Sequence, residues 1–359
     1  MTYRLLNAGS NSNHQLNECD EDISSFKFAR EFNNGVEIAT GGNHTLVLSN
    51  THVYGAGSNS SNQLGLGTDT VHTLTRLDWL SQLYPLHTPT RILASWDTSF
   101  VLLEGFNQSP LFISIGSAEF GARGVANASA TPTPISLPLQ DHHIVHLSAS
   151  FRHIVAILKH NNNETFSVIG WGASRKGQLS DAYKAVPFLA TPHTLLTTST
   201  PLIRVSTGRE HTIIHSADDL ICWGSNAHGQ LNIPSVPKHR TLLYGCTWRG
   251  TVWYDGEALW SVGRTGASPN ATSSDDIRTP QLISDSLPPI QQLAVGSEHT
   301  LLRTADNTVY VCGWNEHGNL GLGHTRDMHT PIRIPLTATH IHAGNATSFI
   351  LTDNVTDDT

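Results

Sequence analysis

Histidine is the residue type in this chain that most invites a chemical function, since 21 are present and an imidazole can bind a metal ion or move a proton. Four of them follow a small residue by three positions and stand directly before an apolar run: His44, His153, His211 and His299. A residue that recurs in front of buried strands is expected to have a structural task, in which the imidazole hydrogen-bonds the backbone of a neighbouring repeat. We therefore predict that these histidines neither bind a metal nor catalyse a reaction.

Other groups that could do chemistry lack the partners that the chemistry needs. His142, His143 and His146 lie close in sequence, but no carboxylate or cysteine stands at metal-ligand spacing, so a solvated loop is expected. No phosphate-binding glycine loop, nucleophilic serine turn or catalytic carboxylate pair occurs. The four cysteines are too far apart for a metal or redox pair and are expected to be free thiols: Cys19, Cys222, Cys246 and Cys312. We predict no catalytic residue, no metal, no cofactor and no enzyme activity.

Two phrases that return seven times each define the elements that hold these residues. The first phrase ends in His or Thr, or once Arg, before an apolar run: His44, Thr98, His153, His211, Arg249, His299 and Thr347. The second phrase begins with an anchor glycine, and these are Gly9, Gly57, Gly116, Gly172, Gly224, Gly263 and Gly313. In the fifth copy of the first phrase Cys246 stands at a position that is glycine in four of the seven units, so we expect it to be a packing substitute. The chain is therefore a repeat protein with seven units.

Each unit of about 50 residues is predicted to be one small antiparallel sheet. The run after His299 leads through a turn to a second run at 308–312 that ends at Gly313, which is the pattern of a β-hairpin. No stretch of helical period and useful length separates the phrases. The predicted fold is all-β, a seven-bladed β-propeller formed by residues 1–352 as a single domain, with a short tail at 353–359.

The two ends of the chain predict how the ring closes. Thr347 has no glycine phrase after it, and the first glycine phrase, at Gly9, has no His/Thr phrase before it. We expect the N-terminal strand, within residues 1–16, to pair with the C-terminal blade and complete it, so that no long strand edge stays open. The anchor glycines are expected to turn the chain with φ above zero and to let strands of adjacent blades approach closely.

Composition argues against several classes of partner. The formal net charge is −8 and no arm rich in Lys or Arg occurs, so we expect no direct binding of DNA and no attraction to an anionic membrane. The first ten residues hold no apolar segment of a secretion signal, and no apolar run approaches the ~18 residues that span a bilayer. These features predict a protein of the cytoplasm, with the nucleus as a second compartment.

The repeats resemble the regulator of chromosome condensation family, whose units carry a Trp-Gly-x-Asn-x-x-Gly-Gln-Leu-Gly phrase and a Gly-x-x-His phrase. Three segments carry the resemblance: CWGSNAHGQL from Cys222, SNSSNQLGLG from Ser58 and GSEHTLL from Gly296. The match covers essentially residues 1–352 and implies a seven-bladed propeller. Family members include nucleotide exchange factors, ubiquitin-ligase modules and adaptors, so the fold alone does not assign a function.

Departures from the repeat pattern indicate where a partner binds. Equivalent loops of a propeller lie on one face around the mouth of its channel, where Trp96, Phe151 and Trp248 replace small polar residues. Aromatic residues among charges are typical of a binding hot spot, while the alternative is that these rings pack into neighbouring loops. The predicted partner-binding residues are Trp96, Asp97, Phe151, Arg152, Glu210, Trp248, Arg249 and Glu298.

Four segments resemble a small fungal branch of the family, the alpha-tubulin suppressor or killer-toxin-insensitivity propellers: ASWDTSFVLL from Ala94, CTWRGTVWY from Cys246, SVGRTG from Ser261 and CGWNEHGNLG from Cys312. This resemblance implies a non-catalytic adaptor that forms a heterodimer with a small CSL-type zinc-binding electron carrier. It also implies an indirect link to the enzymes of diphthamide synthesis on elongation factor two and to Elongator, which modifies wobble uridines of transfer RNA.

Two other functions stay open. A guanine-nucleotide exchange factor for a Ran-type small GTPase would have the same fold, but the chain has no basic N-terminal arm and no long inserted hairpin. Its chief internal extras are turn-rich segments at 183–201 and 267–289. An enzyme at the channel mouth would depend on Asp97, Glu210 and Glu298.

Overall fold

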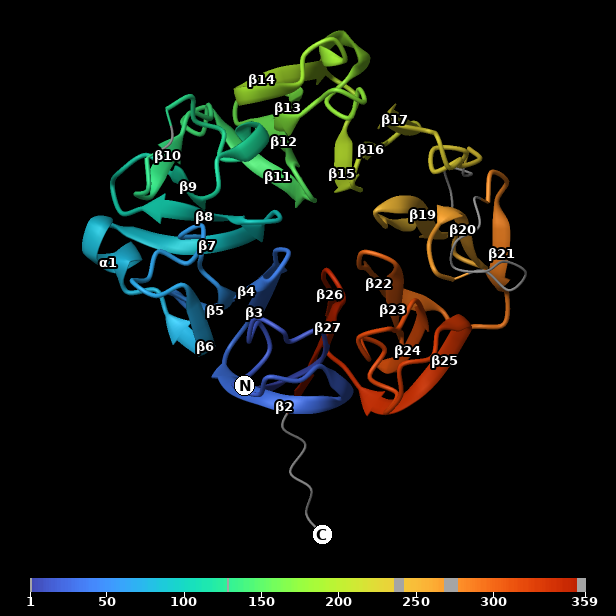
Figure 1. Cartoon of the computed structure of the whole chain (residues 1–359). Coiled ribbons are helices and arrows are strands. Elements are labelled where there is room, and N and C mark those ends of the chain that lie inside the picture. The colour runs from blue at the N-terminus through green and yellow to red at the C-terminus, as the bar shows by residue number, and fades with distance from the viewer. Residues whose placement is uncertain (1, 128, 236–241, 268–276, 354–359) are drawn as a thin grey trace.

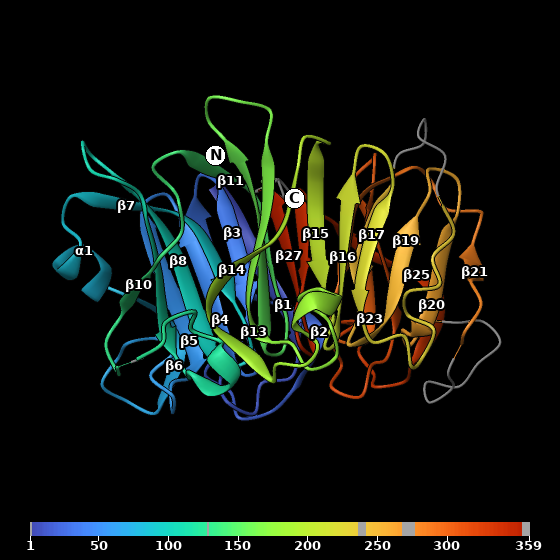
Figure 2. The same cartoon turned by 90° about the horizontal axis from the view of Figure 1, so that it is seen from above.

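Seven antiparallel sheets stand around a central channel, as the repeat count predicts (Figure 1). The computed structural model describes residues 2–127, 129–235, 242–267 and 277–353. In the side view the strands of the sheets run along the axis of the ring (Figure 2). The all-β, seven-bladed propeller is thereby confirmed, and none of the helices in the described ranges is long and apolar enough to cross a membrane.

The blades are numbered along the chain, with blade 7 holding both chain ends. The inner strands that line the channel are β3 (Val36–Thr40), β7 (His87–Ala94), β11 (His142–Ala149), β15 (Leu202–Thr207), β18 (Leu243–Cys246), β22 (Ile290–Val295) and β26 (His340–Ala343). The second strands are β4 (His44–Ser49), β8 (Thr98–Gly105), β12 (His153–His160), β16 (His211–Ser216), β19 (Arg249–Tyr254), β23 (His299–Thr304) and β27 (Thr347–Asp353). Each second strand thus begins at or next to the residue that ends a His/Thr phrase.

The third strands end at the anchor glycines or one residue beyond them. They are β5 (His52–Ser58), β9 (Leu111–Gly116), β13 (Phe166–Ala173), β17 (Leu220–Gly224), β20 (Leu259–Arg264), β24 (Thr308–Gly313) and β1 (Thr2–Gly9). The outer strands are β6 (Thr70–Arg76), β10 (Thr133–Ile135), β14 (Phe188–Thr198), β21 (Gln281–Ser284), β25 (Met328–Thr337) and β2 (Ile23–Asn33), and in the described part of the chain blade 4 has no fourth strand.

Short helices lie between the strands: α1 (Trp79–Leu83), η1 (Glu119–Gly121) and η2 (Asp181–Tyr183). The prediction of a turn-rich segment at 183–201 is wrong for its central part, because β14 forms there and pairs with β13. The second segment includes β21, while residues 268–276 lie outside the described part of the chain.

The N-terminal strand closes the ring. β1 pairs antiparallel with β27, with Tyr3 opposite Asp353 and Gly9 opposite Thr347, and the sheet order is β2-β1-β27-β26. The predicted closure is therefore confirmed, although the N-terminus supplies two strands to blade 7 rather than one. The predicted tail begins later than expected, because Asp353 still belongs to β27, and residues 354–359 lie outside the described ranges.

All seven anchor glycines have a positive φ, between 82° and 118°. At Gly224, where φ is 106°, a Cβ atom would lie 2.3 Å from the carbonyl oxygen of Glu210 in the same blade. The other six meet the equivalent carbonyl in the same way. The expected turn is confirmed, but the main close approach is to a strand of the same blade and not to an adjacent blade.

Substitution of an anchor glycine is expected to destabilise the propeller. Gly224→Ala should lower the free energy of unfolding by at least about 2 kcal/mol, because the new Cβ meets backbone and the residue keeps a left-handed φ. The matched control is Gly67→Ala, since no atom lies within 4 Å of a Cβ there. Urea unfolding measures both variants, and equal stability of the two would contradict this explanation of the repeat.

The fifth His/Thr phrase is shifted by one residue from its predicted register. Gly250, not Arg249, lies opposite the anchor glycine Gly263, just as His44 lies opposite Gly57. Cys246 ends β18 and pairs with Thr251, so it does not replace a glycine. Thr247 takes that place, because its N–H donates to the carbonyl of Gly250 in the manner of Gly41 and His44. Cys246 and Thr247 are adjacent and both small, so the sequence alone could not decide which of them takes the place of the glycine in the phrase.

Three of the buried phrase histidines connect their blade to the next one. Nε2 of His44, His153 and His299 lies 3.0 Å from the hydroxyl oxygen of Ser99, Thr212 and Ser348, respectively, in the following blade. The predicted contact with a neighbouring repeat is confirmed, and a backbone partner in the following blade is present for His153, at His211, and for His299, at Thr347. A neutral ring fits these sites, because burial lowers the pKa of His44, His211 and His299 to about 4 and that of His153 to about 3.

These histidines make stability depend on pH. The unfolded chain binds their protons near pH 6.5 and the folded protein only near pH 4, so the stability is fully present above pH 6.5 and is lost as the pH falls toward 4. His299→Gln should therefore weaken the dependence of the unfolding free energy on pH by about 1.4 kcal/mol per pH unit. Urea unfolding at pH 7, 6 and 5 tests this, and parallel curves for the variant and the unchanged protein would refute it.

Candidate interaction surface at the channel mouth

The loops between inner and second strands lie around one mouth of the channel. The N–H of Gly42 donates to the carbonyl of Trp96 at 2.7 Å, and the N–H of Trp96 donates to the carbonyl of Phe151 at 3.3 Å. On the other side of the ring, Arg209 donates to Trp248 at 3.1 Å and Trp248 donates to Ser297 at 2.8 Å. These backbone bonds join the loops of blades 1 to 3 in one series and the loops of blades 4 to 6 in another.

Three aromatic side chains from blades 2, 3 and 5 meet at this mouth, and we call Trp96, Phe151 and Trp248 the aromatic plug. The centroid of the Trp96 ring lies 4.6 Å from that of Phe151 and 5.9 Å from that of Trp248, and Phe151 and Trp248 are 6.4 Å apart. Nε1 of Trp248 donates to Oδ1 of Asn345 at 3.1 Å. All three rings are half-buried, so they pack against one another and keep part of their surface outward.

Arg209 extends the aromatic plug and was missed in the sequence. Its guanidinium carbon lies 5.0 Å from the ring centroid of Phe151 and 6.0 Å from that of Trp248. It occupies the same place in the phrase of blade 4 that Trp96 has in blade 2, two residues before the phrase residue. An alignment of the seven loops that uses the corrected register of blade 5 places Arg209 at the same position as Trp96 and Trp248, and would therefore have identified it.

The next position of each loop carries a charge in five consecutive blades. The signs alternate from blade 2 to blade 6, and we call these residues the charge collar: Asp97, Arg152, Glu210, Arg249 and Glu298. Burial raises the pKa of Asp97, a shift that Glu119 reinforces and Arg152 opposes. Burial also raises the pKa of Glu298, while Arg249 and Arg264 oppose the shift. All eight residues predicted to bind a partner thus gather at one mouth.

An exposed aromatic residue continues this surface outward over blade 3. Phe120 is 41% exposed and holds a left-handed φ of 54°, which is strained for a phenylalanine. The guanidinium carbon of Arg152 lies 4.1 Å from the Phe120 ring centroid and 4.7 Å from that of Phe151. Arg152 also forms an ion pair of 3.4 Å with Glu119. The sequence signal was a departure from the glycine phrase at Gly116, where Phe120 stands in place of polar residues such as Ser61 and His317.

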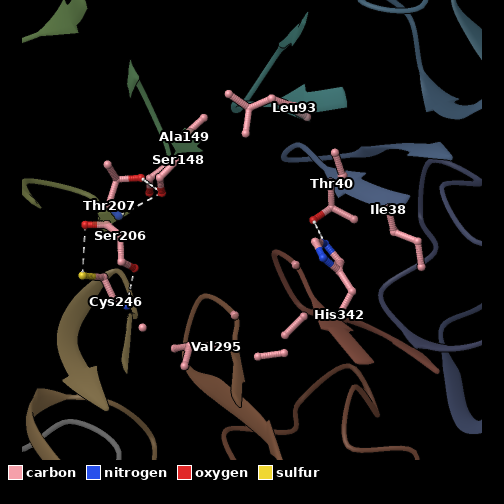
Figure 3. A pocket seen from close by; sticks show the side chains of 18 of the residues that line it. Ile38, Thr40, Leu93, Ser148, Ala149, Ser206, Thr207, Cys246, Val295 and His342 are labelled. Carbon is pink, nitrogen blue, oxygen red and sulfur yellow. Dashed lines mark hydrogen bonds between the residues drawn. The ribbon is translucent and has the colours of Figure 1, made fainter. Parts of the chain in front are cut away.

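Below the aromatic plug the channel encloses a cavity of about 380 Å³. Figure 3 shows its wall, where side chains of neighbouring inner strands meet. Oγ1 of Thr40 in blade 1 lies 3.1 Å from Nε2 of His342 in blade 7. The hydroxyl oxygens of Ser148 in blade 3 and Thr207 in blade 4 are 2.9 Å apart. The wall therefore joins the blades through short polar contacts.

Groups for metal or thiol chemistry are not assembled in the described ranges. No three His, Cys, Asp or Glu residues there could hold a metal ion together. Burial raises the pKa of Cys246 and Cys312 to about 12 and that of Cys222 to about 11, so these thiols stay protonated at neutral pH. The predicted solvated loop at His142, His143 and His146 is wrong, because all three lie on β11, where the strand pairs with β12.

The fold is an all-β propeller with three aromatic side chains in contact at one mouth, and comparison with known proteins supports the regulator of chromosome condensation (RCC1) repeat family. Two models of the RCC1 repeat match residues 290–319 and 306–351. An RCC1 repeat-containing protein of Schizosaccharomyces pombe is 26% identical over 97% of this chain and 98% of its own length. A secretion-regulating guanine nucleotide exchange factor of Bos taurus is 26% identical over 83% of this chain and 70% of its own length.

Solved structures agree on the fold. Human WBSCR16 superposes with a TM-score of 0.81 over 98% of this chain and 99% of that one, at 18% identity. Prp20p of Saccharomyces cerevisiae superposes with a TM-score of 0.78 over 99% of this chain and 93% of that one, also at 18% identity. At this level of identity the two structures show the propeller fold alone.

Proposed function

We propose that the protein is a non-catalytic adaptor that docks a small partner protein on the aromatic plug and the charge collar. The observation that carries the proposal is the meeting of Trp96, Phe151 and Trp248 from three blades at one mouth. Large rings held by their neighbours can anchor a partner with little loss of conformational entropy. No group at the mouth has to react, so the propeller acts as a rigid platform.

The charge collar would set the orientation of the partner. Its signs alternate, so its members largely cancel each other at a distance and attract neither an acidic nor a basic partner strongly. At contact, a partner with charges in the complementary order gains five matched pairs, whereas a rotation by one blade brings like charges together. The charge collar therefore determines the rotational orientation in which the partner binds, while the aromatic plug provides most of the affinity.

The partner we propose is a small CSL-type zinc protein that carries electrons, and the proposal of its identity rests on the fungal resemblance of the segments at Ala94, Cys246, Ser261 and Cys312. In this role the heterodimer supports diphthamide synthesis on elongation factor two and Elongator-dependent modification of wobble uridines. The compartment is the cytoplasm, with the nucleus second. The propeller itself binds no metal and no DNA in this proposal.

A second candidate is guanine-nucleotide exchange on a Ran-type small GTPase. It is favoured by the similarity to the secretion-regulating guanine nucleotide exchange factor of Bos taurus. Against it stands the net charge of −8.

Two assays on the purified protein distinguish these candidates. In isothermal titration calorimetry, a zinc-loaded CSL-type protein is expected to bind with one partner per propeller. In a nucleotide-release assay, the propeller is expected to leave the rate of fluorescent GDP release from a Ran-type GTPase unchanged. Faster release without binding of the zinc protein would favour the exchange factor and contradict the adaptor.

A further inference from the structure

Polar side chains gather at the end of the channel opposite the aromatic plug. Arg91, His146 and Arg204 lie on the inner strands of blades 2, 3 and 4, each seven residues before the phrase residue of its blade, and we call them the basic end. All three line the same cavity as the channel wall. About five residues of extended strand separate the basic end from the aromatic plug, and this corresponds to a distance of roughly 17 Å along the channel.

A break in strand pairing lies directly before each member of the basic end. The register of the inner strand shifts between Pro89 and Arg91, between Ile144 and His146, and between Leu202 and Arg204. A β-bulge turns the following side chain away from the regular alternation and is common next to functional sites. Three adjacent blades therefore use the same device to aim a nitrogen-bearing side chain at one end of the channel.

Two buried nitrogen atoms of the basic end lack a hydrogen-bond partner among the described residues. They are Nδ1 of His146 and Nε of Arg204. A buried donor without a partner is costly, and more so when it belongs to a charged group. The groups also oppose each other, since after burial the two guanidiniums are the further causes that lower the pKa of His146 to about 4.

A carboxylate on the inner strand of blade 1 partly offsets these groups. Glu37 of blade 1 is drawn toward its ionised form by Arg91, but burial is stronger and raises its pKa to about 7. The amide of Gln292 in blade 6 is engaged with the backbone of Ile341, at 2.8 Å and 3.1 Å. Near neutral pH the basic end thus keeps an excess of positive charge at the wall of a cavity.

We propose that the basic end binds a small molecule carrying one oxyanion, either a carboxylate or a phosphate group. Such an anion accepts hydrogen bonds from the guanidiniums and reduces the repulsion between them. The channel beyond has room for the rest of the molecule, because the cavity measures about 380 Å³ and its wall includes the apolar side chains of Leu93, Ala149 and Val295 (Figure 3). This site lies apart from the proposed partner surface and is independent of it.

The test is isothermal titration calorimetry of the full-length protein with inorganic phosphate and, separately, with acetate at constant ionic strength. Arg204→Gln removes a donor of the basic end, and it spares the backbone carbonyl of Arg204 that accepts the hydroxyl of Tyr244 at 2.9 Å. Arg91→Gln, at an exposed residue, is the second variant. Lys27→Gln removes one positive charge from the exposed outer strand β2 and is the matched control.

We expect the unchanged protein and Lys27→Gln to bind at least one of the two anions with equal affinity. Arg204→Gln and Arg91→Gln should each weaken binding by at least about tenfold, the effect of losing one charge-assisted hydrogen bond. The ratio of the two affinities then tells a phosphorylated ligand from a carboxylic acid. Absence of binding by both anions, or affinities that do not change in the two arginine variants, would overturn the proposal.

Discussion

A chain that lacks residues 1–9 is expected to lose the cooperative unfolding transition of the full propeller. β1 lies between β27 and β2, so its removal leaves β2 without a partner in blade 7 and leaves β27 paired only with β26. Leu5 and Ala8 within it are fully buried, so the deletion also opens the core of that blade. Urea unfolding followed by circular dichroism and by tryptophan fluorescence should then show early, non-coincident transitions.

A point substitution tests the same closure in the intact chain. Leu5→Ala should lower the free energy of unfolding by about 3 kcal/mol, because it leaves a cavity between β1 and its neighbours. The control is Arg4→Ala on the exposed side of the same strand, which should change stability by less than about 1 kcal/mol. Equal effects of the two substitutions, or a truncated chain that unfolds like the full one, would show that the closure does not carry the stability of the ring.

Loss of the two tryptophans of the aromatic plug is expected to abolish most of the affinity for the partner. Trp96→Ala and Trp248→Ala should each cost about 2 kcal/mol of binding free energy or more, which is roughly a 30-fold rise in Kd. The rings contact each other, so the double variant should deviate from the sum of the single effects. Calorimetric titration with the zinc protein measures all three variants.

Two controls separate a lost contact from a damaged fold. Phe106→Ala removes an aromatic side chain that is 78% exposed in the turn after β8, at the opposite end of the blade, and it should leave the affinity unchanged. Urea unfolding of the tryptophan variants should still show one cooperative transition. Unchanged partner affinity in the folded double variant would mean that the aromatic plug only closes the channel and that the partner binds elsewhere.

The number of blades and the closure of the ring could be predicted because local chemistry repeats with them. Each anchor glycine is required by a positive φ beside a carbonyl of its own blade, and each buried histidine by a site between two blades. Such residues recur at regular intervals in the sequence. The positions of the mouth residues could be predicted for the same reason, since they stand at fixed distances from the repeated His/Thr phrase.

What could not be predicted depends on pairing and not on residue type. The register of blade 5 was ambiguous because Cys246 and Thr247 are both small, and only the strand pairs at Gly250 resolve it. β2 carries neither phrase, so its place beside β1 in blade 7 had no signal. The basic end was missed because β-bulges, which have no residue signature there, aim His146 and its neighbours into the channel.

Affinity capture of the tagged protein from its native cell extract, with mass spectrometry of the proteins that elute in stoichiometric yield, tests the adaptor function most directly. We predict a small zinc protein of the CSL type together with diphthamide or Elongator subunits, and their loss when the bait carries Trp96→Ala and Trp248→Ala. A Ran-type GTPase in place of these proteins, retained by both baits, would contradict the adaptor and favour nucleotide exchange.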